Sequence, residues 1–439
     1  MAAPDSDPMI PTERPASPPG FAPRSPSPPP PPPPAAEAVA EPHSPSYSPN
    51  SPTYLPPEPA DAAPAVPAAD EPTIGEFTRD KGVTRFVISH VDTSIVNGLR
   101  RTILGQLPLL AIVPFPESDT TVRITANTTP MHNELIKQRL AAINFHLDPD
   151  DPLAGRLQVK LKVGNTSDTV RIVTVGDIEL WDTVADKSLA PEATRAILPP
   201  DPITGDHAML IVLRPPIGTM PGDVLELTAT MRKMTSTANG MYTLASVCAM
   251  GNVADKTARD RAWKTEQAGD SARDRALWEE TAKGRFDIPD TFSFSLRAVR
   301  WLDDRQLLVR GLEHMQRELT ALADKGESGA LNVTKVKDVL AKHTFDVEIP
   351  GDTYSLGHCL RHQLYLSVTA SPQSMLSIVG FDKHHAHDKH GSLRMVFRND
   401  ASAVNASHIT ARAAREVASI YSILIRQLAS RKGGKRTSK

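Results

Sequence analysis

Hydrophobic positions recur with two different periods along this chain, and each period predicts a different kind of element. Between Val83 and His90 the residues alternate between two faces, which is typical of a strand buried on at least one side. A period of three to four residues follows over 93–107 and predicts a helix that is capped by Asp92 or Thr93 and ends at Pro108. Its apolar face consists of Val96, Leu99, Ile103 and Leu107.

A second helix is predicted in the stretch 127–143. Thr128 or Thr129 can cap it, and Pro130 suits the first helical position. Its apolar stripe consists of Leu135, Ile136, Leu140 and Ile143.

Residues 151–285 change in character and predict a β-rich inserted domain. Short apolar runs are separated by Gly, Pro and Asp turns. These runs are 157–163, 170–175, 209–213 and 224–230. The last part, 254–285, is charged and reads as an exposed helical segment that carries Trp263 and Trp278. An exposed tryptophan pair favours a docking surface, and the alternative is two solvated helical turns.

The chain then repeats its order of elements. A strand at 292–296 and an amphipathic helix at 305–322 close the first unit, and 325–329 reads as a hinge. Strands at 344–349, 378–381 and 392–397 follow, with a helix between the first two. That helix carries Leu356, Gly357, Leu360, Arg361 and Leu364. A final helix at 403–428 presents Ile409, Ala413, Val417, Ile420, Leu424 and Leu428 on one side.

Two units with the same order of elements and with apolar helix faces are expected to pack face to face as a pseudo-twofold pair. The expected fold class is α+β, with two related dimerisation units in one chain. The expected domains are a disordered Pro-rich acidic arm at 1–72, a discontinuous first unit at 73–150 and 286–324, the inserted domain at 151–285, a linker at 325–340, a second unit at 341–428 and a basic tail at 429–439.

Composition separates the arm from the body. Residues 1–72 hold 25 of the 41 prolines, two basic residues and nine acidic ones, so their net charge is 2 − 9 = −7. The remaining 47 basic and 42 acidic residues give +5. So much proline and so few aromatic or β-branched residues predict disorder, with a polyproline II run at 28–34.

Several classes of protein are excluded. No run of about 18 apolar residues occurs, so no membrane span is expected. The N-terminus lacks a basic segment followed by an apolar one, so we expect no secretory signal. Cys248 and Cys359 are too few for a disulfide scaffold or a four-cysteine zinc site.

Two motifs resemble a known family. Asn97, Gly98, Leu99, Arg100 and Arg101 resemble the Asn-Ala-Leu-Arg-Arg helix motif of the third-largest subunit of eukaryotic RNA polymerase, of its archaeal counterpart and of the bacterial alpha subunit. The stretch 127–143, which includes Glu134 and Arg139, resembles a second motif of the eukaryotic and archaeal subunits.

The second half resembles the small partner of that subunit. Residues 355–361, Ser-Leu-Gly-His-Cys-Leu-Arg, resemble its Thr-Leu-Gly-Asn-Leu-Leu-Arg motif, and Val379, Gly380 and Phe381 resemble a later region. The resemblance implies a fusion of both partners, as known in large DNA viruses, that serves as a non-catalytic platform for two large catalytic subunits.

The same resemblance implies an interface role for a defined set of residues. The set is Asn97, Leu99, Arg100, Arg101, Ile103, Glu134, Arg139, Leu356, Gly357, Leu360, Arg361, Leu364, Val417, Ile420 and Leu424. Arginine suits such contacts because its planar fork holds carboxylates and carbonyls bidentately. The alternative is that the arginines only cap helix ends or stay solvated.

The sequence departs from this family in three places. Larger members often carry cysteines for zinc or an iron–sulfur cluster in the inserted domain, whereas Cys248 stands alone there, so we expect no cofactor. His358 replaces the motif asparagine, and the arm at 1–72 has no counterpart. The segment 47–53, Tyr-Ser-Pro-Asn-Ser-Pro-Thr, resembles one heptad of the polymerase II tail, or it arises by chance in a Ser/Pro-rich tract.

One histidine cluster suggests a different chemistry. His384, His385, His387 and His390 lie close to Asp382 and Asp388, a composition that can bind a divalent metal. The alternative, which we favour, is a structural or solvated loop. No phosphate-binding loop and no Asp-x-Asp-x-Asp run occurs, so we predict no catalytic residue and no enzyme activity of the chain alone.

The expected partners are two large RNA polymerase subunits and small accessory subunits, with nucleic acid reached only through the complex and no membrane. The expected location is the virion and the host cell interior, either the nucleus or a cytoplasmic viral factory. The basic tail is a nucleic-acid contact, a nuclear address or a solubilising end. The rival functions are a His-metal hydrolase with a Pro-rich targeting arm and a free-standing adaptor that binds through its proline run.

Overall fold

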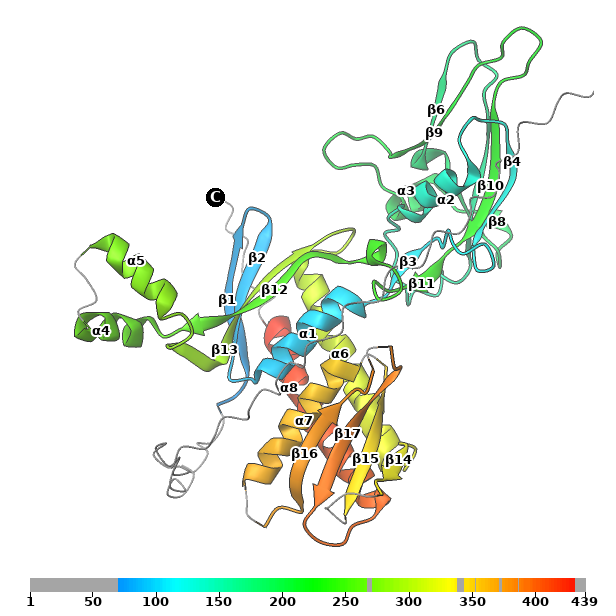
Figure 1. Cartoon of the computed structure of the whole chain (residues 1–439). Coiled ribbons are helices and arrows are strands. Elements are labelled where there is room, and N and C mark those ends of the chain that lie inside the picture. Colours follow the sequence, from blue (N-terminus) through cyan, green and yellow to red (C-terminus); the bar gives the residue numbers. More distant parts are fainter. Residues whose placement is uncertain are drawn as a thin grey trace, which may run out of the picture. The chain divides into compact units, whose positions relative to one another are not determined.

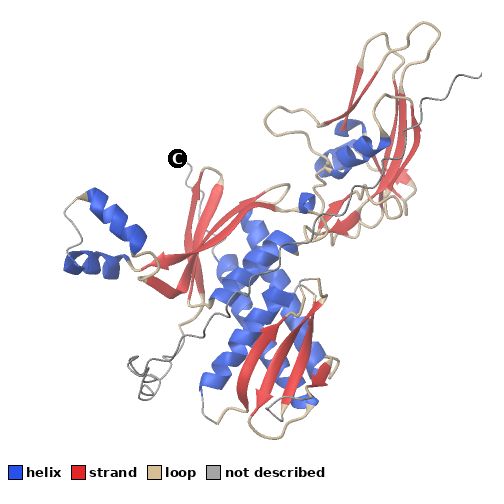
Figure 2. Cartoon of the chain, viewed as in Figure 1, coloured by secondary structure: helices blue, strands red, loops and turns tan. Residues whose placement is uncertain are grey.

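The structure is a computed structural model that describes residues 70–266, 271–337, 343–351, 353–370, 373–385 and 387–430. The expectations for the arm up to residue 69, including the segment 47–53, lie outside the described residues, as do those for 431–439. The described residues form an α+β fold, as the two periods predicted (Figures 1 and 2). No helix among them has the length and apolar character that crossing a bilayer requires.

The first sheet is four-stranded and antiparallel. Its order is β1 (Thr73–Asp80), β2 (Val83–Ser89), β13 (Asp287–Ala298) and β12 (Ala245–Ala254). Alternation places Phe86 and Ile88 on the buried face of β2, where Phe86 stacks on Phe294 of β13 at 4.9 Å between ring centroids. The strand predicted from alternation at 83–90 is confirmed.

Four helices share one hydrophobic cluster with this sheet, the first two from the first half of the chain and the last two from the second half. They are α1 (Thr93–Gly105), α6 (Asp304–Glu327), α7 (Thr353–Ala370) and α8 (Ala403–Ser430). The second half adds an antiparallel sheet in the order β14 (Val333–Lys335), β15 (Thr344–Pro350), β17 (His390–Phe397) and β16 (Leu376–Asp382). One continuous hydrophobic cluster includes both sheets and all four helices, which Figure 2 shows between the sheets.

A second hydrophobic cluster belongs to the β-rich insertion. Its five-stranded sheet has the order β4 (Val122–Asn127), β10 (Val224–Thr230), β5 (Leu157–Gly164), β7 (Glu179–Asp182) and β8 (Lys187–Ser188). Two ribbons pair β6 (Arg171–Thr174) with β9 (Met209–Leu213) and β3 (Leu109–Ala111) with β11 (Arg232–Met234). The helices are α2 (Asn133–Ala141) and α3 (Pro191–Ile197), and two 3-10 turns lie at Val175–Asp177 and Gly240–Tyr242.

Strand pairing moves both expected boundaries of the insertion. We expected it at 151–285, but β4 pairs with β10, and α2 packs into the same cluster, so the insertion begins before residue 122. It ends before β12, because β12 pairs with β13 of the first sheet. Hydrophobic alternation identifies a strand but not its partner, which is decided by contacts distant in sequence.

The helical segment after β12 is a hairpin of α4 (Lys256–Glu266) and α5 (Ala272–Thr281), between β12 and β13. The prediction of an exposed tryptophan pair is wrong. Trp263 and Trp278 are half-buried against each other with ring centroids 5.4 Å apart, and Phe286 lies 5.9 Å from Trp278. The rings therefore hold the hairpin together, because pairing removes apolar surface from water.

The second predicted helix begins later than expected. Pro130 is not its first residue, because α2 starts at Asn133 with His132 as its cap residue. The Thr128 hydroxyl accepts a hydrogen bond from the Val224 N–H at 2.8 Å, so it serves the sheet instead of capping a helix. Leu135, assigned to the buried stripe, is 48% exposed, whereas Ile136, Leu140 and Ile143 are buried.

The predicted hinge at 325–329 and linker at 325–340 are also wrong in part. Helix α6 continues through Glu327, and Gly326 is buried against α8. The chain then enters β14, which pairs with β15. The glycines suggested flexibility, but here one of them permits close helix packing.

Candidate interaction surface

The candidate surface includes α1, and the residue before this helix defines where the helix begins. The Asp92 side chain accepts a hydrogen bond from the Ser94 N–H at 2.7 Å and caps the helix. One face of α1 carries Val96, Leu99 and Ile103, all buried in the shared cluster. Arg100 and Arg101 follow Leu99 along the helix and are half-buried.

Helices α1 and α7 approach closely at a glycine. A Cβ atom at Gly98 would lie 3.3 Å from the Sγ atom of Cys359 and 3.3 Å from the Ser355 carbonyl oxygen, both on α7. The Cys359 thiol lies 3.2 Å from the Ser94 carbonyl oxygen and donates to it. The Tyr421 hydroxyl of α8 donates to the Ile95 carbonyl at 3.0 Å. These contacts join the two halves of the chain at the motif helices.

Arg100 is positioned by its own helix. Its Nε and Nη2 atoms donate to the Asn97 Oδ1 atom at 3.1 and 2.9 Å. The two residues are three positions apart and therefore lie on the same side of the helix. This pair restrains the guanidinium and leaves less of its hydrogen-bonding capacity for another protein.

Arg101 takes part in a cluster that both halves supply. Its guanidinium carbon lies 5.6 Å from the centre of the Tyr354 ring, and the Lys383 Nζ atom lies 5.4 Å from the same ring. The Tyr354 ring also stacks on His358 at 6.1 Å. Two cations over one tyrosine form a basic–aromatic cluster, and Tyr354 is 37% exposed within it.

The floor of this cluster is the Phe381 ring of β16. It lies 5.2 Å from His358, and a Cβ atom at Gly357 would come within 2.2 Å of it, so this position has no room for a side chain. Burial, with smaller contributions from the charges of Arg361 and Arg101, lowers the pKa of His358. Its imidazole is therefore neutral at pH 7, and Arg361 beside it is exposed.

Most of the apolar residues expected at an interface are inside the molecule. Leu356, Leu360 and Leu364 of α7 are buried in the shared cluster, and so are Val417 and Leu424 of α8. They join the two halves of this chain and offer no surface to another protein. Ile420 is only partly buried at the edge of this cluster.

Glu134 and Arg139 do not join the other expected residues. Both are exposed on α2, whose buried face packs into the second cluster. The Arg139 Nη1 atom donates to the Leu210 carbonyl of β9 at 2.6 Å. Arg139 therefore fastens a helix to a strand inside the insertion.

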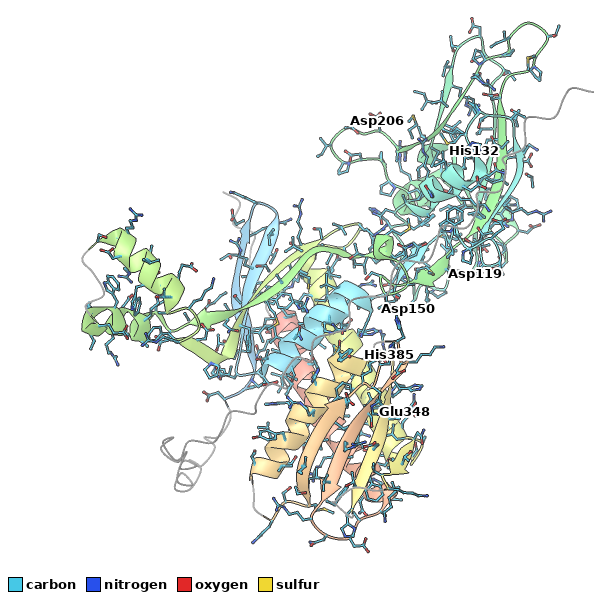
Figure 3. All side chains as sticks on the ribbon, in the orientation of Figure 1. Asp119, His132, Asp150, Asp206, Glu348 and His385 are labelled. Carbon is cyan, nitrogen blue, oxygen red and sulfur yellow. The ribbon has the colours of Figure 1, made fainter. Side chains whose placement is uncertain are left out.

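The histidines of the predicted cluster contact different groups and do not face one common point. The Nδ1 atom of His384 lies 3.2 Å from Asp382, and that of His390 lies 3.0 Å from Glu348. The His387 N–H donates to the Nδ1 atom of His385 at 3.1 Å. Figure 3 shows Glu348 and His385 at the same end of the sheet. Among the residues that the structure describes, which omit Ala386, no three potential ligands converge on a metal position.

The cysteines are also poorly suited to metal binding or nucleophilic chemistry. Both are buried and free, and burial raises the pKa of each thiol to about 12. A thiol with such a pKa stays protonated at neutral pH, whereas the thiolate is the form that binds metals and attacks substrates.

Sequence reasoning missed two members of the basic–aromatic cluster, Tyr354 and Lys383, and named Phe381 only within the resemblance to the small partner subunit. Tyr354 and His358 are four residues apart on one helix, a spacing that could have signalled their contact. Lys383 follows a strand from another part of the chain, and no local pattern predicts its approach. No family model matches the sequence.

Proposed function

We propose that this chain is a non-catalytic assembly scaffold of a multisubunit DNA-directed RNA polymerase, on which the two large catalytic subunits associate. One observation carries the proposal. The two helices whose sequences resemble the assembly subunits, α1 and α7, pack directly against each other through Gly98 and Cys359. A scaffold built from two partners requires this contact, whereas a hydrolase with a single site does not.

The order of elements also supports two related units. In each half a strand leads into a motif helix, as β2 leads to α1 and β15 leads to α7. A long helix closes each half, and these helices, α6 and α8, meet where Gly326 packs against Ala411. We infer a fused pair of dimerisation units, with the insertion and the α4–α5 hairpin added to the first.

The basic–aromatic cluster supplies suitable chemistry for a large partner. Arg101, Arg361 and Lys383 offer positive charge beside the exposed Tyr354 ring. Arginine and tyrosine are enriched at protein interfaces, because each combines apolar area with directed hydrogen bonding. The contacting segment of the large subunit is then acidic, and nucleic acid meets the scaffold only through the complex.

Affinity purification of the tagged full chain from its native cell tests the proposal. We expect two very large subunits and small accessory subunits in stoichiometric yield. The variant Arg101→Glu/Arg361→Glu is expected to lower recovery of a large subunit about tenfold or more, because like charges would face each other. Circular dichroism should show that this variant is folded.

The matched control is Arg123→Glu/Lys187→Glu, which reverses two exposed charges on the insertion. This control should recover the large subunits as well as the natural chain does. Absence of both large subunits from the natural chain's eluate would refute the scaffold. Equal recovery by the two double variants would remove the cluster from the interface.

A further inference from the structure

A second surface of the same helices has the opposite charge. A groove of about 770 Å³ lies in the insertion, but another of about 760 Å³ lies where the two halves meet. The latter is lined by the turn before α1, the start of α1, the residues just before β1, part of β13, and helices α7 and α8. Because residues from both halves form its walls, this groove depends on their association. We call it the junction groove.

The walls of the junction groove carry four carboxylates, Asp70, Asp92, Asp290 and Glu416. Among the described residues that line it, none is a lysine or an arginine. Two histidines are present: His90 Nδ1 lies 3.2 Å from Asp290, and His362 Nδ1 lies 3.4 Å from Asp92. The Glu416 carboxylate accepts from the Gln363 amide at 2.9 Å. The Arg412 Nε atom lies 3.8 Å from the Glu416 carboxylate but does not line the groove. The four carboxylates therefore outnumber the cationic groups near the walls, so the groove attracts cations.

The floor of the groove is apolar. Val91 and Ile95 lie at its base, and Ile420 lies partly buried on one side. Leu366 of α7 also lines the groove and is 43% exposed. A volume of several hundred Å³ with an apolar floor and a few charged groups is typical of a ligand site.

We propose that the junction groove binds a basic, amphipathic segment of a partner protein, with leucine-like side chains on its apolar floor and lysine or arginine side chains at its carboxylates. Charge complementarity selects this occupant, because a basic segment is attracted by the four carboxylates whereas an acidic one is repelled. The inference does not depend on the polymerase assignment.

The chain's own ends do not have the required chemistry. Residues 1–69 carry two arginines and seven carboxylates, a net charge of 2 − 7 = −5, and like charges would repel them from the groove. Residues 431–439, Arg-Lys-Gly-Gly-Lys-Arg-Thr-Ser-Lys, are basic but contain no apolar side chain to cover the floor. A partner segment with both properties fits better than either end.

Fluorescence anisotropy with the full chain and two labelled peptides tests this inference. The probe is an amphipathic peptide about 12 residues long, roughly three helical turns, with leucines on one face and lysines and arginines on the other. In the comparison peptide every basic residue is replaced by glutamate. We expect saturable binding of the basic peptide only, and a loss of binding near 1 M salt, where the Debye length is about 3 Å.

The variant Asp70→Asn/Asp290→Asn/Glu416→Gln should weaken binding of the basic peptide about tenfold. Asp92 is left intact because it caps α1. The control Asp168→Asn/Asp186→Asn/Glu318→Gln removes the same charge from exposed sites elsewhere and should bind as the natural chain does. Leu366→Ser should weaken binding in the natural background, which tests the apolar floor.

Three outcomes would overturn the inference. They are no binding of the basic peptide, equal weakening by the groove and control variants, and full affinity of the Leu366→Ser variant. A chain lacking 431–439 that binds the basic peptide much more tightly than the full chain would instead show that the tail occupies the groove. Circular dichroism of each variant confirms that it is folded.

Discussion

At the scale of single residues, glycines determine how closely the helices approach. Gly326 allows α6 to contact α8, since a Cβ atom there would lie 2.8 Å from the Ala411 Cβ and 3.0 Å from the Ser407 carbonyl oxygen. The Ser407 hydroxyl donates to the Gly326 carbonyl at 2.8 Å, so backbone and side chain are both engaged. Neither atom can rotate away, because the Ser407 oxygen belongs to the backbone and the Ala411 Cβ is bonded directly to the backbone.

Gly326→Ala is therefore expected to lower the free energy of unfolding by about 1–3 kcal/mol, as overpacking does in tight cores. Gly105→Ala, at the end of α1, is the control. A Cβ atom there meets only the Thr237 methyl at 3.7 Å, so the gain in helix propensity should stabilise the chain by up to about 1 kcal/mol. Chemical denaturation measures both, and a Gly326→Ala chain as stable as the natural one would contradict the packing argument.

At the scale of elements, sequence periodicity located most strands and helices but not all of their roles. The apolar spacing predicted a strand at 83–90 and helices at 93–107 and 305–322, which correspond to β2, α1 and α6, although α6 continues to Glu327. Strand β4 was not predicted, and its residues were placed in the first unit, because its pairing with β10 depends on residues about a hundred positions away. The arginines at the candidate surface were visible in the motif, whereas Lys383 beside Tyr354 depends on tertiary packing alone.

The α4–α5 hairpin is an element with its own small core. The Trp278 indole donates to Glu266 at 2.9 Å, and Arg285 pairs with the same carboxylate at 2.7 Å. Trp278→Ala should remove the Trp263 contact and open the hairpin locally, because few other apolar groups hold it.

Hydrogen exchange measures this opening, and we expect faster exchange over 256–266 and 272–281 while the amides of α6 and α8 keep their protection. Leu277→Ala is the control, since Leu277 is 66% exposed beside Trp278. Unchanged exchange in the hairpin of the Trp278→Ala chain would show that the ring contact does not stabilise it.

At the scale of the whole molecule, one hydrophobic cluster connects the two halves. The buried Tyr421 of α8 contacts α1 through its hydroxyl, and Phe345 and Met395 of the second sheet belong to the same cluster as Phe86 of the first. Neither half can bury its apolar helix faces alone, because each face is covered by the other half.

Splitting the chain after Gly329 tests this dependence. The fragments 70–329 and 330–430 should each be insoluble when expressed alone, and should form a soluble one-to-one complex when expressed together. Light scattering after size-exclusion chromatography measures the stoichiometry. A soluble, folded monomer of either fragment would contradict the shared core.

The short connection from the end of α6 at Glu327 to the start of β14 at Val333 has a consequence for how the pair persists in a cell. Two separate polypeptides would dissociate at low concentration, and each could then bind an unrelated protein. Covalent tethering makes their encounter intramolecular, at a local concentration that reaches the millimolar range for short links. A single translated molecule therefore delivers both halves in equal number, and its pairing is insensitive to dilution.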